Sequence, residues 1–141
     1  MLVLIPVSCA PIPPLLAPRT CADGDDCIDV TGNTSSQRGV VVVYDIFGFY
    51  PQTLQGADRL AQHLDAVALV PDFFEGTQAD KSWVPPNTEE KKAAFSKFRS
   101  TTADPAKNLD KLKAVIGEAK TKYPSVEKWA VLGLCWGGKV R

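Results

Sequence analysis

The fold is decided by the stretch WAVLGLCWGGKVR at residues 129–141. Its first four residues are apolar without alternation, as in a parallel strand covered on both faces. The next six, GLCWGG at residues 133–138, have the Gly-x-nucleophile-x-Gly spacing of a nucleophile elbow, a sharp turn from strand to helix. Cys135 occupies the nucleophile position of this motif.

The two flanking glycines have a steric reason. The turn strains the backbone at the nucleophile, and side chains two residues to either side would collide. We therefore expect Cys135 at the carboxyl end of a sheet, with its sulfur facing the N-terminus of the next helix, where unpaired N–H groups favour a thiolate. The alternative is a strand-to-loop turn with a buried structural cysteine.

Length and charge exclude several classes of protein. The 141 residues are enough for one domain with a real core. Sixteen basic and sixteen acidic side chains leave no net charge, which argues against nucleic-acid binding. The four cysteines form no C-x-x-C pair and the single histidine is near none of them in sequence, which argues against a metal site.

The N-terminal stretch at residues 1–17 is apolar but contains four prolines and lacks the basic start of a signal peptide. It is also too short and too rich in proline to cross a membrane as a helix. We expect residues 1–26 to form an irregular arm of a cytoplasmic protein with free thiols and no membrane partner. A secretory signal, with a disulfide between Cys21 and Cys27, is the alternative.

The rest of the chain alternates strand and helix patterns, which predicts an α/β fold. The clearest strand is GVVVVYD at residues 39–45, whose valines indicate a central buried parallel strand. Because ligands bind at the carboxyl ends of such strands, Asp45 is expected at the same edge as Cys135. The other expected strands are 27–30, 67–70 and 129–132, and the expected helices are 53–66, 87–100 with a cap at Asn87, and 105–123 with a cap at Asp104.

Two further features have open interpretations. The loop at residues 71–86 is long enough to be a lid or pocket wall, and its Phe73, Phe74 and Trp83 either line an apolar substrate site or belong to the core. His63 lies beside the apolar stripe of its helix, where a lone histidine is far more often a surface or half-buried residue than a catalytic base.

Three motifs carry a family resemblance: YDIFG at residues 44–48, PDFFEG at 71–76 and GLCWGG at 133–138. In this order they resemble those of the dienelactone hydrolase family of α/β-hydrolases, especially its eukaryotic members. The resemblance covers roughly residues 27–141. It implies the N-terminal part of an α/β-hydrolase domain, with a mostly parallel sheet flanked by helices and ending at the nucleophile elbow.

The resemblance also implies a chemistry, the hydrolysis of a small-molecule carboxylic ester or lactone by a Cys-His-Asp triad without metal or organic cofactor. It places the nucleophile on Cys135 and the oxyanion donors on the backbone N–H groups of Ile46 and Trp136. Asp45 stands where the family carries an acidic residue, usually Glu, that engages the resting thiol. Glu75 and Gly76 stand where bacterial members place an arginine for the dienelactone carboxylate, which argues against dienelactone itself as substrate.

The sequence departs from the family at its end. The triad of this fold runs nucleophile, acid, base along the chain, but only six residues follow Cys135 and none is Asp or His. We therefore expect a chain truncated relative to the family and nearly inactive alone. The alternative is a non-catalytic binding or interaction fragment that uses the exposed edge of its last strand.

Overall fold

The computed structural model describes residues 27–140, which contain a four-stranded sheet with the order β1-β3-β2-β4. β2 pairs parallel with both β3 and β4, whereas β1 pairs antiparallel with β3. The α/β class with a mixed, mostly parallel sheet is therefore confirmed. The strands are β1 (Ile28–Gly32), β2 (Arg38–Val43), β3 (Val67–Pro71) and β4 (Lys128–Gly133). The expected arm at residues 1–26 lies outside the described residues. Cys27 is disulfide-bonded, so the expectation of free thiols is wrong at this residue, and the question of whether it pairs with Cys21 lies outside the described residues.

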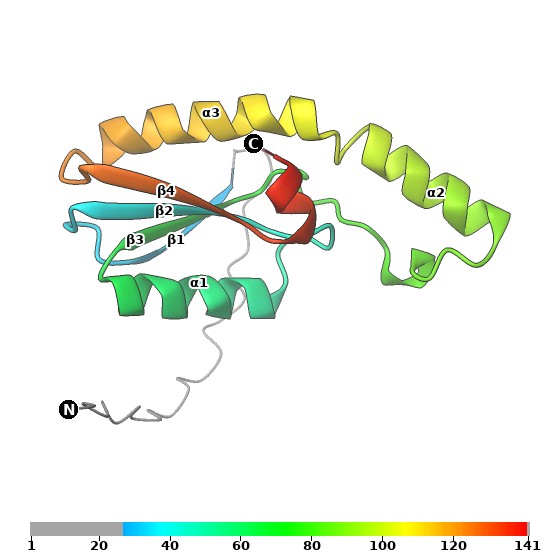
Figure 1. Cartoon of the computed structure of the whole chain (residues 1–141), viewed down its shortest axis with the longest axis horizontal. Helices are drawn as coiled ribbons and strands as arrows, with labels where there is room; N and C mark the ends of the chain where they lie inside the picture. The colour runs from blue at the N-terminus through cyan, green and yellow to red at the C-terminus, as the bar shows by residue number, and fades with distance from the viewer. Residues whose placement is uncertain (1–26, 141) are drawn as a thin grey trace, which may run out of the picture.

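Helices cover both faces of the sheet (Figure 1). α1 (Pro51–Leu64) packs on one face and α3 (Pro105–Lys122) on the other. α2 (Glu89–Ser100) projects beyond the end of the sheet, after the short 3₁₀ helix η1 (Lys81–Trp83). The carboxyl ends of β2 and β4 therefore point toward the side of the molecule on which α2 lies (Figure 1).

The core is built on the two central strands. The valines of β2 and all five residues of β3 are buried. This confirms the central buried strand expected within residues 39–45, although β2 ends at Val43. Each fully buried valine or leucine among them contributes about 1.5–3 kcal/mol relative to an exposed one. The aromatic residues Phe73 and Phe74 are 1% exposed and also belong to this core.

The helix starts follow capping chemistry. Asp104 caps α3 as expected, since its carboxylate accepts the backbone N–H groups of Ala106 and Lys107 at 2.8 and 3.2 Å. The cap predicted at Asn87 is wrong by one residue. Thr88 is the cap of α2, because its hydroxyl accepts the backbone N–H of Lys91 at 3.3 Å.

The last strand differs from its prediction. Residues 129–132 were expected to be covered on both faces, but Val131 and Leu132 in β4 are 46% and 41% exposed. The reason is topological. β4 stands at the edge of the described sheet, with β2 as its neighbour on one side and no described strand on the other.

Candidate functional site

The elbow forms where β4 ends. Cys135 has a φ of 51°, in the left-handed region that a residue with a Cβ enters at a cost of about 1–3 kcal/mol. It begins η2 (Cys135–Lys139), a five-residue 3₁₀ helix. The strained backbone predicted at this position is therefore present.

Both flanking glycines are sterically required. A Cβ on Gly133 would lie 2.5 Å from the backbone carbon and oxygen of Gly137. A Cβ on Gly137 would lie 2.3 Å from the backbone oxygen of Val43, in the neighbouring strand β2. The two glycines of the Gly-x-Cys-x-Gly motif therefore lie where two segments of backbone approach too closely for a side chain.

The thiol of Cys135 is free and exposed, so the alternative of a buried structural cysteine is wrong. The sulfur was expected to face the N-terminus of a helix whose dipole favours a thiolate. In the described residues the segment that follows is the short 3₁₀ helix η2, so the expected helix dipole at the sulfur stays a prediction.

The register of the sheet places Asp45 and Cys135 at the same edge. Val43 at the end of β2 pairs with Gly133 at the end of β4, and each candidate residue stands two positions beyond its strand's paired residue. The Asp45 carboxylate is already engaged, since its Oδ1 accepts the backbone N–H of Phe47 at 2.8 Å. Within residues 27–140 no hydrogen bond joins Asp45 to Cys135.

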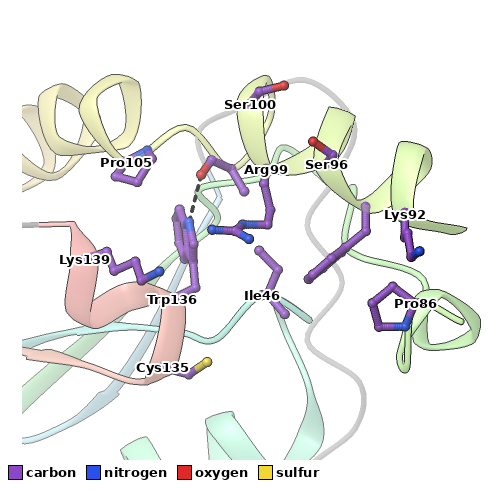
Figure 2. Close-up of a pocket in the computed structure, with 12 residues that line it drawn as sticks. Ile46, Pro86, Lys92, Ser96, Arg99, Ser100, Pro105, Cys135, Trp136 and Lys139 are labelled. Carbon is purple, nitrogen blue, oxygen red and sulfur yellow. Dashed lines mark hydrogen bonds between the residues drawn. The ribbon is translucent and has the colours of Figure 1, made fainter. Parts of the chain in front are cut away.

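A pocket of about 650 Å³ opens beside the thiol (Figure 2). It brings together Cys135, Ile46 and Trp136, three of the four residues expected at the site, whereas Asp45 is not part of its wall. Neither Phe73, Phe74 nor Trp83 lines it. The full lining comprises Ile46, Pro86, Lys92, Phe95, Ser96, Arg99, Ser100, Ala103, Pro105, Cys135, Trp136 and Lys139.

Helix α2 supplies the wall that sequence reasoning missed. Five of its residues line the pocket: Lys92, Phe95, Ser96, Arg99 and Ser100. Of the loop at residues 71–86, expected to be a lid or a pocket wall, Pro86 lines the pocket. The only signal in the sequence was the apolar pair Phe95 and Phe98 on one face of a helix. That pair predicts that the helix packs on the domain, but it does not predict that the helix lines a pocket.

The backbone around the thiol has two donors without partners. In the part of the chain that the structure describes, the N–H groups of Ile46 and Trp136 form no hydrogen bond. Both residues are nevertheless buried, at 8% and 5% exposure. Backbone N–H groups of largely buried residues are nearly always paired in folded proteins, so two unpaired ones on residues that line one pocket are candidate donors to an acceptor bound there.

The three sequence motifs meet in one aromatic cluster. The ring of Trp136 lies 4.5, 6.2 and 6.3 Å, centroid to centroid, from those of Phe74, Phe73 and Tyr44. The indole Nε1 of Trp136 also donates to the backbone oxygen of Ala103 at 2.8 Å. This bond ties the elbow to the loop between α2 and α3.

Asp72 organises the loop after β3. One carboxylate oxygen accepts the hydroxyl of Tyr44 at 2.8 Å and the backbone N–H of Phe74 at 3.1 Å, and the other accepts the backbone N–H of Gly76 at 2.7 Å. Burial, reinforced by the negative charge of Asp72, raises the pKa of Tyr44 well above its ordinary value. The phenol therefore stays neutral and acts as a structural donor.

His63 lies at the opposite end of the sheet from this site. It is exposed near the end of α1, and its Nδ1 is 2.8 Å from the backbone oxygen of Arg59. α1 starts near the carboxyl end of β2 and returns to the start of β3, so its last turn lies at the opposite edge of the sheet. The interpretation of His63 as a surface residue is confirmed.

Residues 27–140 contain no cluster of three His, Cys, Asp or Glu side chains that could bind a metal ion. Over the same residues no helix has the length and apolar character needed to cross a membrane.

Sequence comparisons identify the family of the chain. The family model of the dienelactone hydrolase family matches residues 28–141. An uncharacterized AIM2 family protein of Schizosaccharomyces pombe is 37% identical over 110 residues, covering 78% of this chain and 44% of the relative. A carboxymethylenebutenolidase homolog of Xenopus tropicalis is 33% identical over 109 residues, covering 77% of this chain and 41% of the relative.

The matches cover most of this chain but a minor part of each relative. A second carboxymethylenebutenolidase homolog, from Mus musculus, is 30% identical over 73% of this chain and 39% of its own length. The chain therefore spans less than half the length of the curated relatives it matches. With a family model that matches from β1 to the last residue, the chain belongs to the dienelactone hydrolase family.

Proposed function

We propose that this chain carries the nucleophile and the oxyanion donors of a carboxylic ester or lactone hydrolase. Cys135 is the nucleophile, and the backbone N–H groups of Ile46 and Trp136 stabilise the negative charge on the substrate carbonyl oxygen. Asp45, at the same edge of the sheet, is the acidic residue that influences the resting thiol. The observation that carries the proposal is the exposed thiol on a strained turn beside the unpaired backbone N–H groups of two largely buried residues.

The chemistry is acyl transfer. The Cys135 thiolate attacks the carbonyl carbon, and the resulting oxyanion accepts hydrogen bonds from the two backbone donors. When the tetrahedral intermediate collapses, a C–S bond has formed, the C–O bond has broken and the alkoxide or phenolate leaves with its electron pair. Hydrolysis of the thioester then requires water and a general base.

The base is the part that this chain does not supply. His63 is its only histidine, and the exposed ring sits at the wrong edge of the sheet. We therefore expect the 141-residue chain to form an acyl-enzyme and to release it very slowly.

A burst experiment tests the proposal. 4-Nitrophenyl acetate is mixed with the chain, released 4-nitrophenolate is followed by absorbance, and the acetylated site is located by mass spectrometry of peptides. We expect close to one equivalent of phenolate, with acetate on the peptide that contains Cys135. Cys135→Ser should acylate on the order of 100-fold more slowly, because an unactivated hydroxyl is a far weaker nucleophile.

His63→Gln is the matched control and should leave the burst unchanged. A burst of equal rate and size in Cys135→Ala would refute the assignment of the nucleophile. A fast steady state that disappears in His63→Gln would refute the view that the base is missing from this chain.

A second candidate function rests on a different observation. Val131, Leu132 and Leu134 are exposed apolar residues at and after the outer edge of β4, and an open strand edge with such side chains is a template for pairing with another strand. On this alternative the chain is a non-catalytic interaction fragment. A thiol that shows no burst, in a chain that associates through β4, would favour it.

A further inference from the structure

The pocket beside Cys135 has an uneven distribution of charge. Its lining includes Lys92, Arg99 and Lys139 and contains no aspartate or glutamate. The chain as a whole carries no net charge, so this concentration of cations does not follow from composition. It is a property of the place where α2, the α2–α3 loop and η2 meet.

Two of the three cations have no compensating anion. The Nζ of Lys92 is paired with Glu89 at 2.7 Å. Within the described part of the chain, neither Arg99 nor Lys139 forms an ion pair, and the guanidinium of Arg99 has only the ring of Phe95, at 5.9 Å, beneath it. Unpaired cations in a concave, partly apolar site raise the local concentration of anions.

The two side chains approach from different elements (Figure 2). Arg99 reaches down from α2 and Lys139 extends from η2, and both heads are directed toward the space around Trp136. Lys139 stands four residues after Cys135 on the same 3₁₀ segment, about 8 Å along its axis at about 2 Å per residue. An acyl group bound at the sulfur can therefore present a second polar group to these cations.

We infer that Arg99 and Lys139 form an anion subsite that selects esters bearing an oxyanion, a carboxylate or a phosphate, a short spacer away from the reacting carbonyl. The inference rests on the proposed function, because it takes Cys135 to be the reacting thiol. Arg99 supplies the planar fork that binds either group in a bidentate manner. Lys139 supplies a point charge beside the nucleophile. Both are specificity residues for that reaction.

Alkylation of Cys135 tests the subsite without requiring hydrolysis. Iodoacetate and iodoacetamide react by the same displacement of iodide, in which a C–S bond forms and a C–I bond breaks, but only the first is an anion. The ratio of their rates cancels the pKa of the thiol. Relative to the same ratio for glutathione, we expect an increase of about 5- to 20-fold at low salt, read at the peptide containing Cys135.

The variants locate the effect. Arg99→Gln and Lys139→Gln should each lower the ratio about 3- to 5-fold, and the double variant should return it to the glutathione value. Arg59→Gln on α1 and Lys113→Gln on α3 remove the same charges from exposed positions outside the pocket, and neither should change the ratio by more than about 1.5-fold. Far-ultraviolet circular dichroism of each variant establishes that the fold is retained.

Protection distinguishes the two sources of the anion. Glutarate should slow alkylation if the subsite fits a carboxylate, and inorganic phosphate should do so if it fits a phosphate. In the substrate arm, the mono-4-nitrophenyl ester of glutarate should acylate Cys135 faster than the neutral pentanoate ester, by a factor that disappears in the double variant.

The outcomes separate the two proposals. An iodoacetate ratio equal to that of glutathione, together with no protection by either anion, overturns the subsite. Acylation of Cys135 with no preference for the anionic ester also overturns it, while the hydrolase proposal stands. An anion preference in alkylation without any acylation by esters overturns the hydrolase proposal and shows a subsite that serves another ligand.

Discussion

At the scale of single residues, steric exclusion determines which residues the elbow can contain. Cys135 can take its left-handed backbone only if the residues two positions away have no side chain, because Gly133 and Gly137 both touch backbone atoms. Gly137 packs against the carbonyl of Val43 on the neighbouring strand. The conformation of the turn is therefore constrained by the neighbouring strand as well as by its own backbone.

Gly133→Ala should lower the free energy of unfolding by about 2–4 kcal/mol, because the new methyl group would lie 2.5 Å from the backbone of Gly137. Urea denaturation followed by tryptophan fluorescence measures the change. Gly117→Ala is the matched control. Nothing lies within 4 Å of the methyl group that it adds in α3, so it should raise stability by about 0.5–1 kcal/mol. Equal effects of the two substitutions would contradict the steric account.

The sequence predicted the residues of the elbow better than their partners. A Gly-x-Cys-x-Gly spacing encodes a local backbone geometry, which depends on few distant atoms. The carboxylate of Asp45 was expected to meet the thiol, but its Oδ1 accepts the N–H of Phe47 in its own turn. An Asp side chain two residues from a backbone donor makes this local bond readily, and spacing along the chain does not exclude it.

At the scale of elements, the joint between β2 and the loop after β3 depends on one buried phenol. The hydroxyl of Tyr44 donates to Asp72 and accepts the backbone N–H of Phe74 at 2.8 Å. Asp72 in turn accepts the N–H of Gly76. The motifs at residues 44–48 and 71–76 are thus joined by hydrogen bonds as well as by ring packing.

Tyr44→Phe should lower the free energy of unfolding by about 1–3 kcal/mol at pH 7, because a buried acceptor and donor lose their partner. The pH dependence gives a second readout. Burial raises the pKa of Tyr44 in the folded chain, so the stabilisation from the neutral phenol is complete below the unfolded pKa of about 10 and declines as pH rises above it. Urea titrations at several pH values should show wild type losing about 1.4 kcal/mol more per pH unit than Tyr44→Phe beyond that point. Parallel curves for the two proteins would contradict the burial of the phenol.

Helices and strands were predictable to the extent that local chemistry defines them. The four valines from Val40 onward identified the central strand, and Asp104 followed by Pro105 identified the start of α3. The role of α2 as the wall beside Cys135 was not predictable. It depends on where the helix lies after a long loop, which the pattern of residues along the helix does not report.

At the scale of the whole molecule, the described sheet is asymmetric. Its central strands are buried, but β4 carries the exposed residues Val131 and Leu132 at an edge that no described strand covers. The continuous apolar pattern of residues 129–132 predicted a strand covered on both faces. That prediction was wrong because hydrophobicity along the chain does not report which elements lie beside a strand in the sheet. Its exposure in this chain has a consequence for association.

Leu132→Lys should weaken self-association of the chain at least about 10-fold, because a lysine on a strand edge opposes pairing with another strand. Sedimentation velocity over a range of concentrations measures it. Leu64→Lys, at the end of α1, replaces a leucine of similar exposure away from that edge and should leave association unchanged. Wild type that stays monomeric at all concentrations would remove the edge as an interaction surface.

The bond between the indole of Trp136 and Ala103 reaches across these scales. Trp136 provides a proposed oxyanion donor through its backbone, while its side chain holds the loop that ends α2. A ligand that displaces this loop must also disturb the indole bond, so occupancy of the pocket and orientation of the donor are linked by one coupling free energy, equal in both directions. Binding of a ligand in the pocket and the orientation of the Trp136 backbone N–H would then depend on the same conformational equilibrium.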